Sequence, residues 1–194
     1  MIRLLLAATL ASLVAWATPA HSAGPGQTAI LVAKRQLNDP FYKATVLVVR
    51  PMGGDQHIGM IVNRPTKMTL GQLFPDHKPS HKVADPVFLG GPSSASVIFA
   101  LVHRTQSPGG KSLRLLPDLY IAFETATVDN IIENDPKHAR FVAGLVTWQP
   151  GELRDEIRRG AWHVMDADPA LIMRKPDGMW DDLVRRAEIR AQGI

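Results

Sequence analysis

Short apolar runs rich in β-branched residues alternate with turn formers through the first two thirds of the chain, a pattern that predicts strands. Seven runs share this character: 28–33, 44–49, 57–62, 87–90, 96–103, 112–116 and 119–123. The turn formers of 50–55 join the second run to the third as a hairpin. The apolar run 139–147 fits either a buried strand or a helix, because periodicity alone does not separate the two.

The last third predicts helices, and the segment after Trp148 has the most specific start signals. Pro150 suits the first helical position, which makes Gln149 the predicted cap and lets Glu152 reach back to a free backbone N–H. Gly160 predicts where this helix ends.

The remaining segments complete the expected order of elements. Helical turns or helices are predicted at 69–74, at 128–133 capped by Thr125 or Thr127, at 169–173 capped by Asp168, and after Asp177 with Trp180, Leu183, Val184 and Ala187 on one face. An exposed excursion is predicted at 75–86 and a strand at 161–165. Strand runs followed by peripheral helices indicate a single α+β domain over residues 24–194, with a mixed β-sheet and short flanking helices.

Residues 1–23 have the three-part layout of a secretory signal peptide. One positive charge at Arg3 precedes the apolar run 4–17, and small residues follow before the glycine-rich segment 24–26. The apolar run is shorter than the ~20 residues that span a bilayer, so cleavage is favoured and no stable membrane span is expected afterwards. The sequence therefore predicts a periplasmic or secreted protein. If the signal interpretation is wrong, a cytoplasmic location follows.

Composition excludes only a few functional classes of protein. The chain has 194 residues, of which 45% are hydrophobic and 21% are charged, as in an ordinary globular protein. The lack of cysteine excludes a disulfide framework, a thiol nucleophile and a lipid-modified cysteine anchor. Without residues 1–23 the chain has 21 basic and 18 acidic residues, a net charge of +3. Its basic groups are interleaved with acids, so a nucleic-acid partner is not expected.

Few of the polar clusters meet the requirements of a catalytic or metal site. His77 and His81 have the spacing of two ligands on one helical face, but Pro79 argues against a helix and no third ligand is near. No metal ion or cofactor is therefore predicted. The chain lacks the Gly-x-Ser-x-Gly nucleophile motif, and a His–carboxylate pair built on His57 or His103 is the catalytic alternative left open.

Two clusters at predicted strand ends are candidate binding elements. Asn63-Arg64-Pro65 ends a strand, and an extended Arg64 can present its guanidinium to a carboxylate or phosphate, or close the loop internally. Gly90-Gly91-Pro92 follows another strand, where its backbone could hold an anion or simply make a tight exit. Both readings stay open for each cluster.

Several segments of this chain resemble the AlgH/YqgE family of bacterial proteins. They are DPFYKATVLVV at 39–49, GMIVNRP at 59–65, LGGP at 89–92, TWQPGELRDEI at 147–157 and GAWHVMDADPALIM at 160–173. Their order and spacing together extend the resemblance over roughly residues 28–188. It implies an α+β fold of coiled sheets and flanking helices.

The biochemical activity of that family is not established, although its members are often labelled transcriptional regulators. The family is thought of as cytoplasmic, whereas this chain begins with a signal-like segment. A second departure is Gln149, which stands where family members usually have glycine before Pro150, so a special backbone angle there would be lost.

Three functions follow for testing. The leading hypothesis is a non-catalytic binding or interaction protein, exported, whose partner is an unknown protein or a small anionic ligand. Its candidate surface consists of Asn63, Arg64, Pro65, Gly90, Gly91, Pro92, Trp148 and Glu152. The alternatives are a cytoplasmic transcriptional regulator, as the family label suggests, and a hydrolase-like enzyme with a His–carboxylate pair.

Overall fold

The computed structural model describes residues 27–192, so the predicted signal segment 1–23 lies outside the described residues. Its strands are β1 (Ala29–Ala33), β2 (Val46–Gly53), β3 (Gln56–Ile61), β4 (Pro65–Thr69), β5 (Pro86–Leu89), β6 (Ser93–His103), β7 (Ser112–Leu116), β8 (Leu119–Ala122), β9 (Ala139–Trp148) and β10 (Trp162–Asp166). Its helices are α1 (Leu70–Leu73), α2 (Thr125–Asn134), α3 (Glu152–Arg158), α4 (Pro169–Met173) and α5 (Met179–Ala191), with 3₁₀ turns η1 (Lys78–Lys82) and η2 (Pro136–His138).

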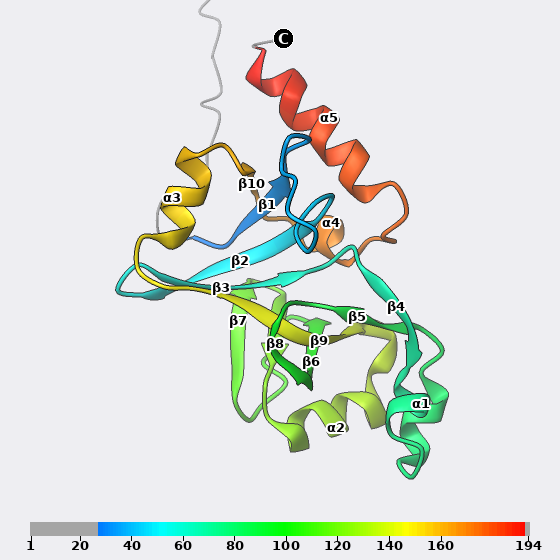
Figure 1. Cartoon of the computed structure of the whole chain (residues 1–194). Helices are drawn as coiled ribbons and strands as arrows, with labels where there is room; N and C mark the ends of the chain where they lie inside the picture. Colours follow the sequence, from blue (N-terminus) through cyan, green and yellow to red (C-terminus); the bar gives the residue numbers. More distant parts are fainter. Residues whose placement is uncertain (1–26, 193–194) are drawn as a thin grey trace, which may run out of the picture.

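The strands form one curled sheet in the order β10-β1-β2-β3-β9-β6-β8-β7. Strand β5 pairs with β9 in parallel, and β4 pairs with β5. Apart from the β5–β9 pair, all pairings of the described strands are antiparallel. Figure 1 shows α3 and α5 at one end of the molecule and α1 and α2 at the other. The predicted mixed α+β class with short flanking helices is confirmed.

Strand β9 links the two halves of the sheet, which decides the ambiguity of the run 139–147 in favour of a strand. Its first residues pair with β6 and β5, and its last residues pair with β3. Gly144, between these parts, has φ +73°, and a Cβ there would lie 2.3 Å from the carbonyl oxygen of Gly91. Glycine at this position therefore lets β9 change direction against a closely approaching backbone.

Apolar side chains pack on both faces of the strands near β1. Residues 30–33 of β1 are all buried, as expected where helices or a second part of the sheet cover both faces. Helices α4 and α5 contribute Ile172, Leu183 and Val184 to the main core cluster. A separate cluster lies between α2 and strands β6 and β8, and a third includes Trp148 and Trp162 beside α3.

Arg140 joins β9 to the chain around α4. Its guanidinium donates hydrogen bonds of 2.7–3.1 Å to four carbonyl oxygens, those of Val62, Ile172, Met173 and Arg174. It also lies 4.3 Å from the ring centroid of Phe88. Burial lowers the pKa of Arg140 to about 10, because the protein interior disfavours the charged form.

Some of the helix caps predicted from the sequence are present in the structure and others are not. The helical turn expected at 69–74 and the Asp168 cap are confirmed: Thr69 and Gln72 form a capping box, and Asp168 accepts from the N–H of Ala170. Gln149, Asp177 and the two threonines are wrong as caps. The residues before α3 and α5 are Gly151 and Gly178, both in left-handed conformations, and Glu124 precedes α2.

Most of the segment 75–86 is exposed, as expected, but Ser80 is fully buried and Val83 nearly so, because η1 folds back toward α1 and α2. The sequence also gave no signal for β4, which is mostly exposed and lacks an apolar run. Among the described residues, no helix is long and apolar enough to cross a membrane.

Candidate functional site

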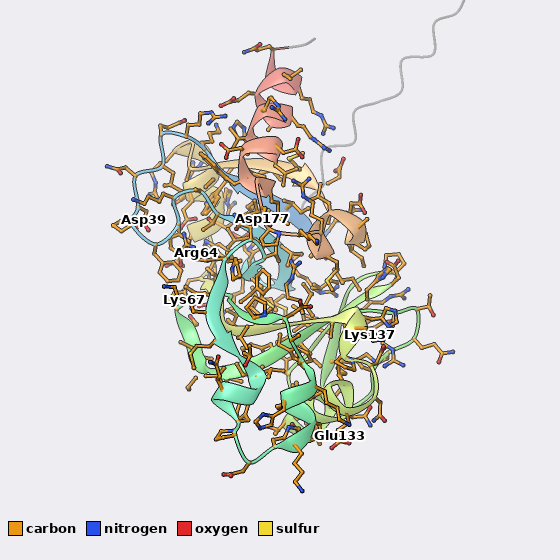
Figure 2. All side chains as sticks on the ribbon, turned by 90° about the vertical axis from the view of Figure 1, so that its right-hand side faces the viewer. Asp39, Arg64, Lys67, Glu133, Lys137 and Asp177 are labelled. Atoms are coloured by element: carbon orange, nitrogen blue, oxygen red, sulfur yellow. The ribbon has the colours of Figure 1, made fainter. Side chains whose placement is uncertain are left out.

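Asn63 and Arg64 hold a loop rather than project from a strand end. The side-chain oxygen of Asn63 accepts from the Val46 N–H at 2.8 Å, and its amide donates to the carbonyl of Ala44 at 2.9 Å. The guanidinium of Arg64 donates to the carbonyls of Phe41 and Lys43 at 2.5 and 3.2 Å. Burial lowers the pKa of Arg64. The side chains of Asn63 and Arg64 therefore hold the loop of residues 39–45 in place. Figure 2 shows Arg64 below the part of the loop that carries Asp39.

The loop that these side chains hold has an unusual backbone. Ala44 has φ +57°, a conformation that non-glycine residues adopt at a cost of roughly 1–2 kcal/mol. The carboxylate of Asp39 caps the start of the same loop, since its Oδ1 accepts from the N–H groups of Phe41 and Tyr42, both at 2.8 Å. The position of Tyr42 is thus determined by contacts at both ends of the loop.

Gly90 and Gly91 make a tight strand exit. The N–H of Gly90 donates to the carbonyl of Ala143 at 2.8 Å, and its carbonyl accepts from Ile61 at 2.9 Å. A Cβ on Gly90 would lie 2.4 Å from the carbonyl oxygen of Gly144, and one on Gly91 would lie 2.2 Å from that of Leu145. Close backbone approach explains both glycines, and the Gly90 N–H is already used within the protein. Pro65 and Pro92 beside them are exposed.

Trp148 and Glu152 attach α3 to the sheet. Trp148 is only 4% exposed, and a Cβ on Gly59 would lie 2.8 Å from its ring, so glycine leaves room for the indole. Glu152, the first residue of α3, accepts from the Gln149 N–H at 2.8 Å, so its carboxylate reaches back as the sequence predicted although Gln149 is not the cap. Gln149 itself has no positive φ, so glycine is not required there; Gly151 has φ +89° instead.

The carboxylate of Glu156, one turn further along α3, accepts hydrogen bonds from two tryptophans. Its Oε2 lies 3.0 Å from the indole nitrogen of Trp148 and 2.7 Å from that of Trp162. Both indoles are 4% exposed, and buried indole N–H groups need an acceptor. Glu156 therefore joins β9, α3 and β10 through one oxygen. The other oxygen, Oε1, accepts no hydrogen bond from the described residues.

A cavity of about 350 Å³ opens beside this carboxylate, and we call it the Glu156 pocket. It is lined by Gln36, Leu37, Asp39, Tyr42, Glu156, Arg159, Gly160, Ala161 and Trp162. The rings of Tyr42 and Trp162 meet edge to face with their centroids 6.1 Å apart. Burial raises the pKa of Tyr42, and the negative charges of Glu156 and Asp39 raise it further.

Four of the eight predicted site residues support the walls of this pocket without lining it. Asn63 and Arg64 fix the loop that carries Tyr42, whereas Trp148 and Glu152 fix the helix that carries Glu156. Of the other four, Gly90 and Gly91 lie where the chain between β5 and β6 approaches β9, Pro92 follows them, and Pro65 pairs with Phe88 of β5.

Tyr42, Glu156 and Trp162, three of the residues that line the pocket, were not among the site residues predicted from the sequence. One signal was present: Trp148 and Trp162 flank a short helix, and each needs a hydrogen-bond acceptor when buried. Glu156 lies inside that helix, eight residues from one tryptophan and six from the other. Its contact with both depends on how β9 and β10 are arranged, which the sequence alone does not determine.

A second cavity, about 390 Å³, contains two His–Asp pairs, and we call it the histidine pocket. It is lined by His103, Arg104, Thr105, Gln106, Asp118, Asp135 and His138. His103 lies 2.9 Å from Asp118 and His138 lies 2.5 Å from Asp135. Continuing the β6–β9 register beyond Val102↔Ala139 puts His103 opposite His138. The imidazole of His57, by contrast, has a hydrogen bond with the backbone carbonyl of Asp55 and none with a carboxylate among the described residues.

A third cavity, about 420 Å³, lies between α2, β6 and η1 and includes His77 and Ser80. His77 lies 2.7 Å from the Ser80 hydroxyl and 3.9 Å from a carboxylate oxygen of Glu133, which Figure 2 marks on α2. Ser80 is fully buried, so its hydroxyl is not open to a substrate. His81 contacts the carbonyl of Pro75. Within residues 27–192, no group of three or more His, Asp or Glu side chains is placed to hold a metal ion.

The curled sheet and its short flanking helices place the protein in the mixed α+β class. The chain belongs to the AlgH-like family, whose family model matches residues 30–192. It is 31% identical over 170 residues to a UPF0301 protein of Thermobifida fusca, covering 81% of this chain and 85% of the relative. It is 30% identical over 171 residues to one of Ruegeria pomeroyi, covering 84% and 91%.

Two solved structures share the fold. The solution structure of the AlgH protein from Pseudomonas aeruginosa gives a TM-score of 0.71 at 22% identity, covering 87% of this chain and 92% of that one. The crystal structure of a Corynebacterium diphtheriae protein gives a TM-score of 0.69 at 20% identity, covering 86% and 89%. The resemblance to the AlgH/YqgE family is confirmed.

Proposed function

We propose that this protein is a non-catalytic binding protein and that the Glu156 pocket is its ligand site. The observation that carries the proposal is the carboxylate of Glu156, which takes two buried indole N–H groups on Oε2 and leaves Oε1 without a protein donor among the described residues. A carboxylate fixed by buried aromatic donors at a cavity wall is oriented before any ligand arrives, and such preorganisation lowers the free-energy cost of binding.

The way the pocket is assembled supports the same proposal. Its walls come from the 36–42 loop and from the segment 156–162, which are more than a hundred positions apart in the chain. Each wall has its own support, Asn63 and Arg64 for the loop and Trp148 and Glu152 for the helix. The volume of about 350 Å³ falls within the range of small-molecule sites.

The proposal is tested by NMR with the indole N–H signals of Trp148 and Trp162 as reporters, assigned from Trp148→Phe and Trp162→Phe. Titration with neutral, anionic and cationic fragments is expected to shift both signals for at least one class. The Tyr42→Ala variant should lose that response, and Asp118→Asn, in the histidine pocket, should keep it. If no fragment moves either signal in the folded protein, the Glu156 pocket is not a ligand site.

A hydrolase-like activity is the second candidate, and the observation that favours it is the His103–Asp118 contact of 2.9 Å inside a cavity. A carboxylate-bound imidazole can act as a general base. The pair ranks second because the two side chains are 47% and 37% exposed and no hydroxyl contacts the imidazole among the described residues. Turnover of ester or phosphoester substrates that disappears in His103→Ala would establish the activity.

We also propose that the protein is exported, on the basis of the charge, apolar run and small residues of 1–23. The mature N-terminus and compartment of a C-terminally tagged copy test this. Processing near Ala20–Ala23 would support it, and an intact N-terminus in the cytosol would contradict it. The comparisons give no specific support to the cytoplasmic regulator alternative.

A further inference from the structure

Two carboxylates face the Glu156 pocket, and each is fixed through one oxygen only. Glu156 uses Oε2 for the two indoles, and Asp39 uses Oδ1 for the N–H groups of Phe41 and Tyr42. The second oxygen of each accepts no hydrogen bond from the described residues. The protein thus orients two negative groups and leaves acceptor capacity on both.

Two aromatic residues, Tyr42 and Trp162, form part of the remaining lining. Tyr42 and Trp162 meet at an interplanar angle of 79°, so the ring of one residue turns its edge to the ring of the other. Aromatic faces beside carboxylates attract cations, because the negative face of each ring adds to the charge of the carboxylates. Arg159 is the one basic residue of the lining, and it is exposed, as is Asp39.

We propose that the Glu156 pocket binds a cationic head group, an alkylammonium or guanidinium, with Glu156 and Asp39 as its acceptors and Tyr42 and Trp162 as its walls. This inference rests on the proposed function, because it assigns a chemistry to the same pocket. It replaces the anionic ligand expected from Arg64, whose guanidinium already donates to the carbonyls of Phe41 and Lys43. An anion in the pocket would meet the two carboxylates of the lining, whereas the nearby basic groups are Arg159 in the lining and the Lys34 ammonium, which lies 3.8 Å from where a Cβ on Gly160 would be.

The first experiment compares probes of one shape and different charge: n-butylammonium, n-butanol and butyrate. Each is titrated into the full chain while the Trp148 and Trp162 indole signals are followed. We expect n-butylammonium to bind about tenfold or more tightly than the other two, and added salt to weaken it. Equal or tighter binding of butanol or butyrate overturns the cation assignment while leaving the ligand site in place. No response to any probe overturns both.

Matched variants test the acceptors. Glu156→Gln keeps a carbonyl oxygen for the indoles and removes the charge, so the protein should stay folded while n-butylammonium affinity falls about tenfold. Asp39→Asn should act in the same direction, and Arg159→Gln should strengthen binding because it removes the one positive charge of the lining. Asp118→Asn is the control. Unchanged affinity in Glu156→Gln with dispersed indole signals contradicts the assignment.

A last comparison separates the two sources of such a cation. N-acetyl-lysine amide and a short lysine-containing peptide are titrated beside n-butylammonium. Tighter binding of the peptide indicates the side chain of a protein partner, and tighter binding of the free amine indicates a small molecule. Rejection of all three contradicts the proposal.

Discussion

The Glu156 pocket and the histidine pocket both pair a carboxylate with ring nitrogens, but they differ in what holds the carboxylate. Glu156 accepts from two indoles that are 4% exposed and always carry their proton. Asp118 and Asp135 contact imidazoles that are 47% and 63% exposed and whose donor role depends on the tautomer. The first arrangement fixes a half-buried carboxylate through two buried donors, and the second is a surface contact open to water.

The two pockets also differ in the backbone conformation of the residues at or near them. Ala44, two residues after Tyr42, has φ +57°, an unfavourable conformation for a residue with a side chain. None of the described residues that line the histidine pocket has a positive φ. Unfavourable backbone conformations persist where surrounding contacts determine them, and they concentrate at functional sites. Strain of this kind distinguishes the loop beside the Glu156 pocket from the histidine pocket, although Asp55 and Ser94, which line neither pocket, also have positive φ.

The largest expected effect is on stability, and it contrasts the two carboxylates directly. Glu156→Ala leaves two buried indole N–H groups without an acceptor, so we expect a loss of about 2–5 kcal/mol in the free energy of unfolding. Asp118→Ala removes an exposed pair and should cost under ~1 kcal/mol. Urea denaturation of both variants measures the difference. Equal losses would mean that the indole hydrogen bonds contribute no more than a surface contact.

The sequence predicted the support of the Glu156 pocket better than the pocket itself. Asn63, Arg64, Trp148 and Glu152 stand out because strand ends and helix starts have local chemical requirements. Tyr42 and Trp162 have no such local requirement. They meet because β1 pairs with both β2 and β10, a long-range arrangement that opposes Ala33 to Trp162.

The same limit explains the two glycines after β5. The sequence allowed Gly90 and Gly91 to be either an anion-holding turn or a tight exit, since glycine suits both. The decision comes from β9, whose backbone lies where their Cβ atoms would be. Strand positions, by contrast, followed from local apolar runs, so most strands agree with the prediction while mostly exposed β4 does not.

The second prediction concerns the loop wall. Arg64→Ala removes two hydrogen bonds from a guanidinium to the carbonyls of Phe41 and Lys43, and we expect a loss of about 1–3 kcal/mol. Hydrogen exchange at the Lys43 and Thr45 amides should become faster. Arg154→Ala is the control, because Arg154 pairs with exposed Asp55 and should cost under ~1 kcal/mol. Slow exchange in Arg64→Ala would show that the loop holds its own conformation.

The third prediction tests the backbone strain beside Tyr42. Ala44→Gly relieves the left-handed conformation but adds freedom to the unfolded chain, so the net gain should be about 0.5 kcal/mol. Ala95→Gly, at an exposed strand position without a positive φ, should instead lose about 0.5–1 kcal/mol. Thermal or urea unfolding gives both signs. If Ala44→Gly destabilises the protein, the conformation of Ala44 is not strained, and backbone strain no longer distinguishes the two pockets.

The smallest effect is in the titration of Tyr42, whose pKa is raised above its ordinary value of 10.0 by burial first and then by the charges of Glu156 and Asp39. The folded state therefore keeps its proton where the unfolded state loses it, and this part of the stability disappears as pH rises above about 10. Glu156→Gln removes one of the two charges, so the pKa of Tyr42 should move down and the alkaline loss should become smaller. Ultraviolet titration follows the phenol, with Tyr42→Phe to assign it against Tyr120. Asp118→Asn should leave the pKa of Tyr42 unchanged, because Asp118 lies in the histidine pocket. If Asp118→Asn lowers the pKa of Tyr42 as much as Glu156→Gln does, Tyr42 responds to the net charge of the protein rather than to a carboxylate beside it.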